Sequence, residues 1–158
     1  MKIQIRNMTY RDLSDVCEIE VAYYNEKNGN LITPSALAWK IKDYEDAVSE
    51  SNQLAIVAEN KDKVIGVLVY SRPQEDEYFD IIRMVANPLV EVDYNIRKNL
   101  LGWIVNFSKE DIKRKKLRLL VDGDDIETMK FMEHIKWPHK RTRDKNDSYL
   151  YSWDCSKD

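Results

Sequence analysis

Hydrophobic positions recur along this chain with two periods, and the period assigns most segments to helix or strand. Alternation over residues 3–5 predicts a short first strand. Apolar positions spaced by three and four then predict helices over residues 13–24 and 34–48. Thr9 with Asp12 forms a capping-box variant before the first of these helices, and a proline opens the second.

From residue 53 on, the pattern of apolar residues changes to one typical of strands. Apolar runs at residues 53–59 and 64–70, joined by NKDK, predict a hairpin, and YFDIIRMVA at 78–86 predicts a further strand that Asn-Pro ends. Residues 87–107 lead into the longest amphipathic helix. The pattern next predicts a strand at 117–121, a helix capped by Asp124 with Glu127, and a last hairpin with strands at 139–143 and 148–153.

The resulting order is β-α-α-β-β-β-α-β-α-β-β, which predicts an α/β protein with one mixed sheet and helices on its faces. Internal repeats, low-complexity tracts and Pro/Gly-rich linkers are absent from the sequence. We therefore expect a single domain over residues 1–158.

Charge and cysteine content narrow the class of protein. Charged residues make up 34% of the chain but nearly cancel to a net charge of −3, which argues against nucleic acid as a partner. Cys17 and Cys155 lie near opposite ends without metal-ligand spacing, so we expect both to be reduced. The start lacks the apolar segment of a signal peptide, and the apolar runs are too short to cross a bilayer. These features predict a cytoplasmic protein without a membrane partner.

Five segments, taken in order, resemble the GNAT superfamily of acyl-CoA-dependent N-acetyltransferases. IQIRNMTYRDL resembles that family's first strand and helix, VIGVLVY its third strand with Gly66 in the usual place, and IIRMVANP its fourth strand. NLLGWIV resembles the next helix, and LRLLVDGDDIETMKFMEHIKW the fifth strand and fourth helix. The resemblance covers nearly the whole chain. It implies a mixed, mostly antiparallel sheet of about seven strands flanked by four helices, and transfer of an acetyl group from acetyl-CoA to a small-molecule or peptide amine.

In this family the fourth and fifth strands splay apart, and the pantetheine arm of CoA bonds to the backbone of the fourth strand. The pyrophosphate lies on free N–H groups at the start of the following helix, where the helix dipole attracts an anion. Carried onto this chain, the resemblance implies a set of acetyl-CoA-binding residues: Met84, Val85, Ala86, Asn95, Ile96, Arg97, Lys98 and Asp125.

The glycines of the family's pyrophosphate loop are missing here. The loop pattern, a Gln or Arg followed by two small residues, falls on Val92, Asn95 and Arg97. In one interpretation Arg97 and Lys98 add charge to an altered cradle, because an arginine fork donates two parallel hydrogen bonds to phosphate. In the other, the segment is an ordinary helix start capped by Asp93 or Asn95, with Arg97 and Lys98 in solvent. Glu91 and Asp93 repel a pyrophosphate unless they point away.

Asp80 falls where many family members carry an acidic general base on the fourth strand. Tyr78 and Glu77 are nearby alternatives. The competing interpretation is a strand residue on a solvated face.

The general-acid tyrosine of the family falls on Met132, and a thioether cannot donate a proton. Tyr149 and Tyr151 share one face of the last strand. Either tyrosine supplies the missing proton, or both serve only in packing.

Tyr23, Tyr24 and Trp39 fall where the family's first two helices shape the acceptor site, with core packing as the alternative role. The acidic run at residues 74–77 either attracts a cationic amine or forms a solvated loop.

His134 and His139 have no carboxylate or cysteine at metal-ligand spacing, so the sequence predicts no metal. Edge strands of the last hairpin offer a surface for a homodimer. The missing glycines and Met132 also keep a second function open, a catalytically inactive GNAT-like binding module.

Overall fold

The structure is a computed structural model of the chain, and it describes residues 2–29, 33–49, 53–71, 78–110, 116–122, 125–135, 139–143 and 148–155. Within these residues, seven strands and four α-helices follow one another in the order that the sequence pattern predicts. A short 3-10 turn before the first helix is the one addition to that order. The acidic run at 74–77, including Glu77, and the expected cap Asp124 lie outside the described residues.

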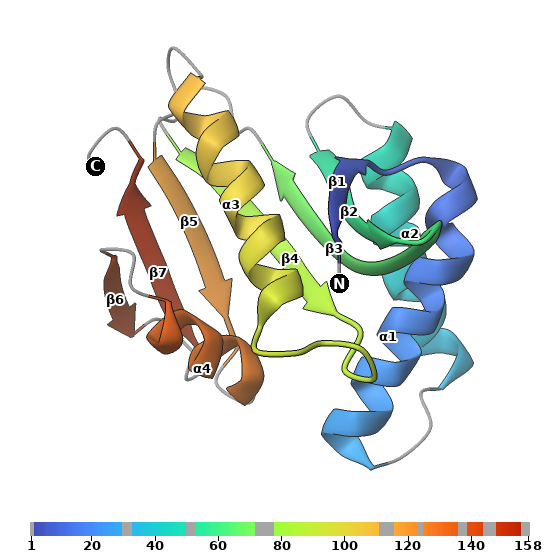
Figure 1. Cartoon of the computed structure of the whole chain (residues 1–158). Helices are drawn as coiled ribbons and strands as arrows, with labels where there is room; N and C mark the ends of the chain where they lie inside the picture. The colour runs from blue at the N-terminus through green and yellow to red at the C-terminus, as the bar shows by residue number, and fades with distance from the viewer. Residues whose placement is uncertain are drawn as a thin grey trace.

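All seven strands form one sheet in the order β1-β2-β3-β4-β5-β7-β6 (Figure 1). Their neighbours pair antiparallel, except for β4 and β5, which are parallel. This confirms the mixed, mostly antiparallel sheet. The strands are β1 (Gln4–Asn7), β2 (Gln53–Asn60), β3 (Lys63–Ser71), β4 (Tyr78–Ala86), β5 (Lys116–Val121), β6 (Lys140–Arg143) and β7 (Tyr149–Asp154).

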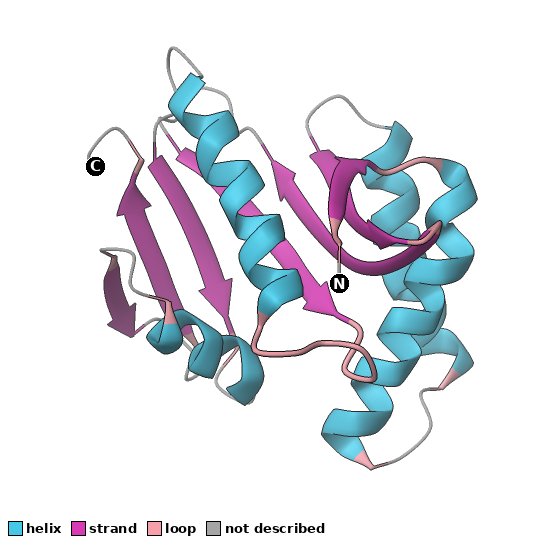
Figure 2. Ribbon diagram, in the orientation of Figure 1, coloured by secondary structure: helices cyan, strands magenta, loops and turns pink. Residues whose placement is uncertain are grey.

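Helices cover the sheet on both faces (Figure 2). They are α1 (Leu13–Asn28), α2 (Pro34–Ser49), α3 (Asn95–Glu110) and α4 (Ile126–His134), with the 3-10 turn η1 at Tyr10–Asp12. The capping box that the sequence predicts is present, because the Thr9 backbone N–H donates to Asp12 Oδ2 at 2.8 Å. Gly29 ends α1 in the left-handed conformation, where glycine avoids a steric cost.

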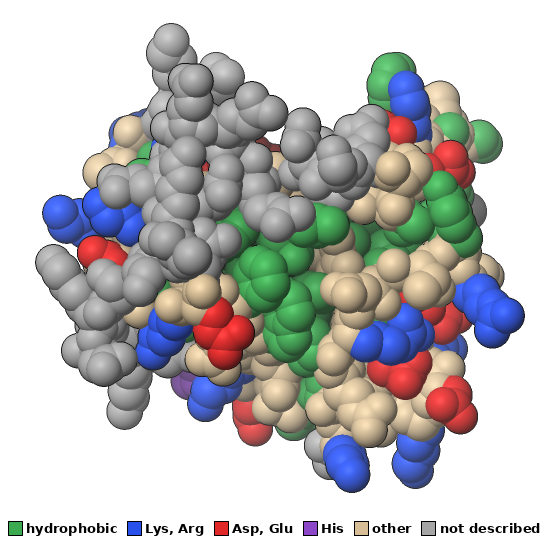
Figure 3. Space-filling model, turned by 90° about the horizontal axis from the view of Figure 1, so that it is seen from above, with side chains coloured by type: hydrophobic (Ala, Val, Ile, Leu, Met, Phe, Trp, Pro, Cys, Tyr) green, Lys and Arg blue, Asp and Glu red, His purple; other side chains and the backbone are tan. Residues whose placement is uncertain are grey.

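Two apolar layers hold the elements together. The larger layer lies between the sheet and the helices α3 and α4, and it includes Phe79, Leu100 and Phe131, each fully buried. The smaller layer lies between the sheet and the helices α1 and α2, with Val16 and Val67 at its centre. The surface carries both charge signs, and in the view from above hydrophobic side chains gather in the middle of the face while charged ones lie around its rim (Figure 3).

Gly66 on β3 lets the first turn of α3 approach the sheet. A Cβ atom added at this position would lie 2.4 Å from Ile96 Cγ2 and 3.2 Å from Leu100 Cδ1. Real carbon atoms do not approach so closely, so the glycine fixes how near the start of α3 lies to β3 and β4.

The parallel pair β4 and β5 separates part of the way along. Residues 78–81 of β4 pair with residues 116–119 of β5, whereas β4 continues to Ala86 with β3 as its partner. The register with β3 shifts between Val69 and Tyr70, which leaves Ile82 as an extra residue in a bulge. The two strands therefore open toward their carboxyl ends, where α3 and α4 begin.

Candidate functional site

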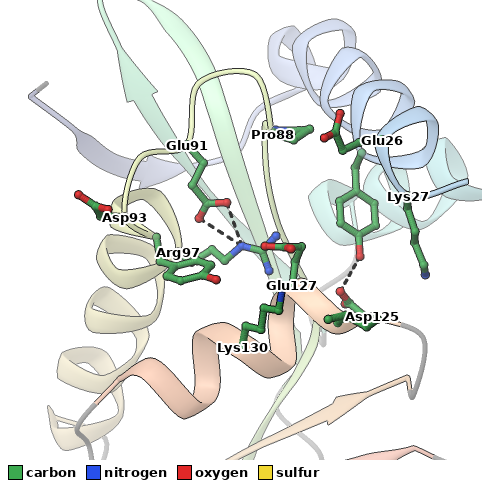
Figure 4. Close-up of a pocket in the computed structure, with 12 residues that line it drawn as sticks. Glu26, Lys27, Pro88, Glu91, Asp93, Arg97, Asp125, Glu127 and Lys130 are labelled. Atoms are coloured by element: carbon green, nitrogen blue, oxygen red, sulfur yellow. Dashed lines mark hydrogen bonds and ion pairs between the residues drawn. The ribbon is translucent and has the colours of Figure 1, made fainter. Parts of the chain in front are cut away.

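A pocket of about 710 Å³ lies at the carboxyl ends of β4 and β5, bounded by α1, the 87–94 loop and the first turns of α3 and α4 (Figure 4). Two helix N-termini thus face one cavity, and each carries partial positive charge. The pocket is lined by Tyr23, Glu26, Lys27, Pro88, Glu91, Asp93, Tyr94, Arg97, Asp125, Ile126, Glu127 and Lys130. Five of these side chains are acidic and three are basic, so the wall carries an excess of negative charge.

The turn into α3 adopts a left-handed backbone without using glycine. Asp93 and Tyr94 have φ values of 51° and 57°, and the Asn95 N–H donates to the Val92 carbonyl at 2.9 Å. L-residues adopt this conformation at a cost of roughly 1–2 kcal/mol each. The positive-φ residues are thus 93 and 94, whereas the family's small residues fall at 95 and 97. The glycine-free sequence still makes a tight turn, two residues earlier than the family pattern suggests.

Arg97 points into the pocket rather than into solvent. Its side chain is only 2% exposed, its Nε lies 3.2 Å from Glu91, and its Nη1 donates to Thr128 Oγ1 at 2.8 Å. The interpretation of Arg97 as a solvated residue is therefore wrong, because the guanidinium joins the start of α3 to α4. Lys98, the next residue, is exposed.

Glu91 also points inward, toward Arg97 (Figure 4). Its side chain is 12% exposed, and Arg97 Nε donates to Oε2 while Oε1 has no hydrogen-bond partner. The backbone N–H of Arg97 adds an attractive contact to the same carboxylate. Burial raises the pKa of Glu91 above its ordinary value, because the attraction of Arg97 offsets only part of the cost of removing the charge from water. A carboxylate therefore lies against the first turn of α3, in contact with both the side chain and the backbone N–H of Arg97.

The start of α4 is tied to α1 across the pocket. Asp125 is the N-cap of α4, where it accepts from the Thr128 backbone N–H and from Thr128 Oγ1, and it also accepts from Tyr23 Oη at 2.6 Å. The predicted cap, Asp124, was wrong by one residue. Burial and the hydrogen bond to Asp125 both raise the pKa of Tyr23 above its ordinary value, so this phenol stays protonated at neutral pH.

The predicted backbone contacts for the acyl chain lie beside this pocket. Met84, Val85 and Ala86 form the end of β4, beyond the last pair with β5, and all three side chains are buried. Asn95 is half-buried and Ile96 is fully buried at the start of α3. The structure thus brings the residues expected to bind the cofactor to one end of the molecule.

Asp80 lies elsewhere, in the paired part of β4. Its carboxylate forms a two-point ion pair with Arg118 of β5, with Nε–Oδ1 at 2.7 Å and Nη2–Oδ2 at 3.1 Å. Arg118 also lies 4.3 Å from the ring of Tyr78. Both charged side chains remain about one-third exposed, so Asp80 is oriented yet accessible.

The candidate proton donors lie on the α3/α4 side of the sheet. Tyr151 pairs with Leu119 and Tyr149 with Val121, both of which belong to the larger apolar layer. Tyr151 is fully buried, whereas Tyr149 is half-buried. Burial raises the pKa of Tyr151. Met132, at the family's general-acid position, is fully buried as well.

A buried charged cluster joins α1, α2 and β4 on the other side of the sheet. Glu20 is 1% exposed, and it accepts two hydrogen bonds from Arg83, at 2.9 and 2.7 Å, and one from the Tyr44 hydroxyl. Lys40 lies 3.7 Å away. The four residues line a cavity of about 160 Å³.

Sequence reasoning missed this cluster and the Tyr23–Asp125 contact. The sequence does carry a signal for the cluster, because a charged residue stands where the pattern calls for an apolar one. Glu20 follows Val16 by four residues in the first helix, and Arg83 interrupts the apolar strand IIRMVA. Opposite charges at two buried positions indicate a pair. Of the residues expected to shape the acceptor site, Tyr23 lines the pocket of about 710 Å³, whereas Trp39 is 70% exposed.

Solved structures give a clear answer on the fold. An acetyltransferase of the GNAT family from Staphylococcus aureus Mu50 is similar with a TM-score of 0.77 and 14% identity, covering 98% of this chain and 100% of that chain. The PaiA N-acetyltransferase from Thermoplasma acidophilum, in complex with coenzyme A, is similar with a TM-score of 0.72 and 14% identity, covering 98% and 99%. The protein smu.2055 from Streptococcus mutans UA159 is 25% identical, with a TM-score of 0.69 and coverage of 97% and 99%.

The chain therefore has the GNAT fold over nearly its whole length, which confirms the expected fold. No protein-family model matches the chain, and no curated protein sequence matches it.

In the described part of the chain, His, Cys, Asp and Glu side chains do not gather in groups of three that could hold a metal ion. The helices among these residues are too short or too polar to cross a membrane. Cys17 and Cys155 are both free thiols.

Proposed function

We propose that this protein is an N-acyltransferase that transfers an acetyl group from acetyl-CoA to an amine. The observation that carries the proposal is the opening between β4 and β5, which leads to a pocket of about 710 Å³ between the N-termini of α3 and α4. The coenzyme A bound to a protein of the same fold supports the same conclusion.

The pyrophosphate of the cofactor would lie at the start of α3. The backbone N–H groups of Ile96 and Arg97 would receive it, the latter in place of Glu91, and the Arg97 guanidinium would add further donors beside the half-buried Asn95, whose own N–H is held by the Val92 carbonyl. Lys98 lies at the same helix end and adds positive charge. Asp125, held by Thr128, would orient the part of the cofactor that passes α4.

The acyl end would lie along Met84, Val85 and Ala86. Residues 84–86 still pair with β3 but no longer with β5, and a backbone N–H on the open side would stabilise the oxyanion that forms when the amine attacks the thioester. The amine nitrogen bonds to the carbonyl carbon, the C–S bond then breaks, and CoA leaves as the thiol. Starting from the ammonium form, the nitrogen loses two protons, one before the attack and one as the amide forms, and the sulfur gains one, which defines the need for a base and an acid.

Asp80 is the proposed base and Tyr149 the proposed acid. The Arg118 fork fixes the orientation of Asp80, and partial exposure lets a substrate ammonium approach it, directly or through water. Tyr149 is favoured over Tyr151, because a fully buried phenol cannot reach a leaving thiol.

The test is release of free CoA thiol from acetyl-CoA in the presence of polyamines, aminoglycosides and peptides with a free N-terminus. The proposal predicts amine-dependent release with at least one class. Once an acceptor is found, Asp80→Asn and Tyr149→Phe should each slow release by about 10²–10⁴-fold. Tyr10→Phe, at an exposed position on η1, is the matched control and should leave the rate unchanged.

A non-catalytic binding module is the second candidate. Two observations favour it: Glu91 fills the anion-binding position, and Met132 replaces the proton donor of the family. Acetyl-CoA that binds in the calorimeter without thiol release for any amine would select this alternative.

A further inference from the structure

Glu91 and Arg97 form a contact that the proposed reaction does not need. Arg97 is held on one side by Thr128, which in turn donates to Asp125 at 2.8 Å, so the guanidinium stays in place without Glu91. Glu91 contributes the second partner, from an irregular loop rather than from a helix or strand. Arg97 and Thr128 therefore stay in place, and a ligand can take the position of Glu91.

The carboxylate is also poorly satisfied where it lies. One of its oxygens, Oε1, lies 3.2 Å from Arg97 Nε but receives no hydrogen bond, and the ion pair offsets only part of the cost of burying the charge. A buried polar atom without a hydrogen bond is costly. A phosphate offers more acceptor oxygens than a carboxylate to the Arg97 side chain and backbone N–H. The Glu91 carboxylate becomes hydrated when it moves into solvent.

The loop around Glu91 gives the side chain room to leave. Leu89 is 77% exposed and Val92 is 60% exposed, so few side chains cover this part of the loop. The N–H groups of residues 89, 90 and 91 donate to Asn87, so the backbone is held and only the Glu91 side chain has to turn outward.

We propose that Glu91 is a competitor built into the cleft: its carboxylate occupies the phosphate position at the α3 N-terminus and must be displaced before an anionic ligand binds. The inference rests on the proposed function, because it concerns the same cleft. Glu91 thereby lowers the affinity of the cleft for anionic ligands. It excludes small anions whose binding does not offset the free energy lost when the Glu91–Arg97 contact breaks.

The direct test compares inorganic pyrophosphate and CoA by calorimetry on wild type and on Glu91→Gln at one ionic strength. Glutamine keeps the size of the side chain but removes its charge. Loss of one charge-assisted hydrogen bond to Arg97 should tighten both probes by about tenfold or more. Asp93→Asn is the matched control, because it removes a charge from an exposed wall of the same pocket, and it should change affinity by less than about threefold.

Equal gains in affinity from Glu91→Gln and Asp93→Asn would overturn the inference. They would mean that any loss of negative charge in the pocket favours the anion, without displacement of Glu91. Equal CoA affinity in wild type and Glu91→Gln would overturn it while leaving the proposed function intact. Absence of CoA and pyrophosphate binding to both proteins would overturn both. If Glu91→Gln fails to fold, Glu91→Asp serves instead, since the shorter carboxylate no longer reaches Arg97 and should also tighten pyrophosphate.

Discussion

Gly66→Ala tests how the sheet positions the start of α3. The added Cβ would lie 2.4 Å from Ile96 Cγ2, far inside normal contact distance. Ile96 is fully buried, and a β-branched side chain in a helix has essentially one rotamer, so Ile96 cannot turn away. The first turn of α3 must move instead.

The size of the effect follows from two opposing contributions. Overpacking a close-packed site costs about 1–3 kcal/mol. Replacing glycine by alanine restricts the unfolded chain and returns about 0.4–1 kcal/mol. We expect a net loss of about 0.5–2 kcal/mol in the free energy of unfolding. Affinity for acetyl-CoA should fall as well, because Arg97 follows Ile96 directly on the displaced turn.

Urea unfolding with a constant m-value measures the loss. The control is Ile96→Leu, which conserves volume and removes the methyl group that collides with the new Cβ. The double variant Gly66→Ala, Ile96→Leu should lose less stability than the sum of the two single variants. A Gly66→Ala protein as stable as wild type, or strictly additive losses, would refute the packing argument.

Three further predictions concern the buried cluster. Arg83→Ala leaves Glu20 buried with weaker partners and should lower the free energy of unfolding by about 3 kcal/mol, whereas Arg141→Ala, at an exposed pair, should change it by less than about 0.5 kcal/mol in the same urea titration. Burial alone would raise the pKa of Glu20, but the ion pair with Arg83 brings it below the ordinary value of 4.5. The stabilisation by Glu20 is therefore complete above pH 4.5 and is lost as the pH falls through that lower pKa. The difference in free energy of unfolding between wild type and Glu20→Gln should therefore shrink in acid. A difference that does not change with pH would contradict the ion pair. Tyr44→Phe removes one hydrogen bond to this carboxylate and should cost about 1.5–3 kcal/mol by thermal unfolding, and an unchanged midpoint would contradict the contact.

The fold was predictable from the sequence because its signals are periodic. The alternation of YFDIIRMVA predicts residues 78–86 as a strand, and β4 has these bounds. The spacing of apolar residues likewise predicts α3, although its first residue depends on a turn at 93 and 94 that no glycine announces.

The place of the candidate site in the chain was expected only from the family resemblance, and its interior was not predicted. Arg97 does lie on the buried face of α3, three and four residues before Leu100 and Leu101, but its charge argued for solvent, and Glu91 lies in a loop without a period. The Tyr23–Asp125 contact joins positions 102 residues apart, which no local pattern encodes. The contacts among the charged side chains of the pocket are therefore the part that only the structure supplies.

Hydrogen–deuterium exchange with and without saturating acetyl-CoA tests the central claim, that the cofactor lies between β4 and β5 with its pyrophosphate at the start of α3. If the cofactor binds there, exchange should slow in peptides that contain residues 84–86 and 95–98 and stay unchanged in β6. Protection confined to other segments, or no protection at millimolar acetyl-CoA, would contradict it.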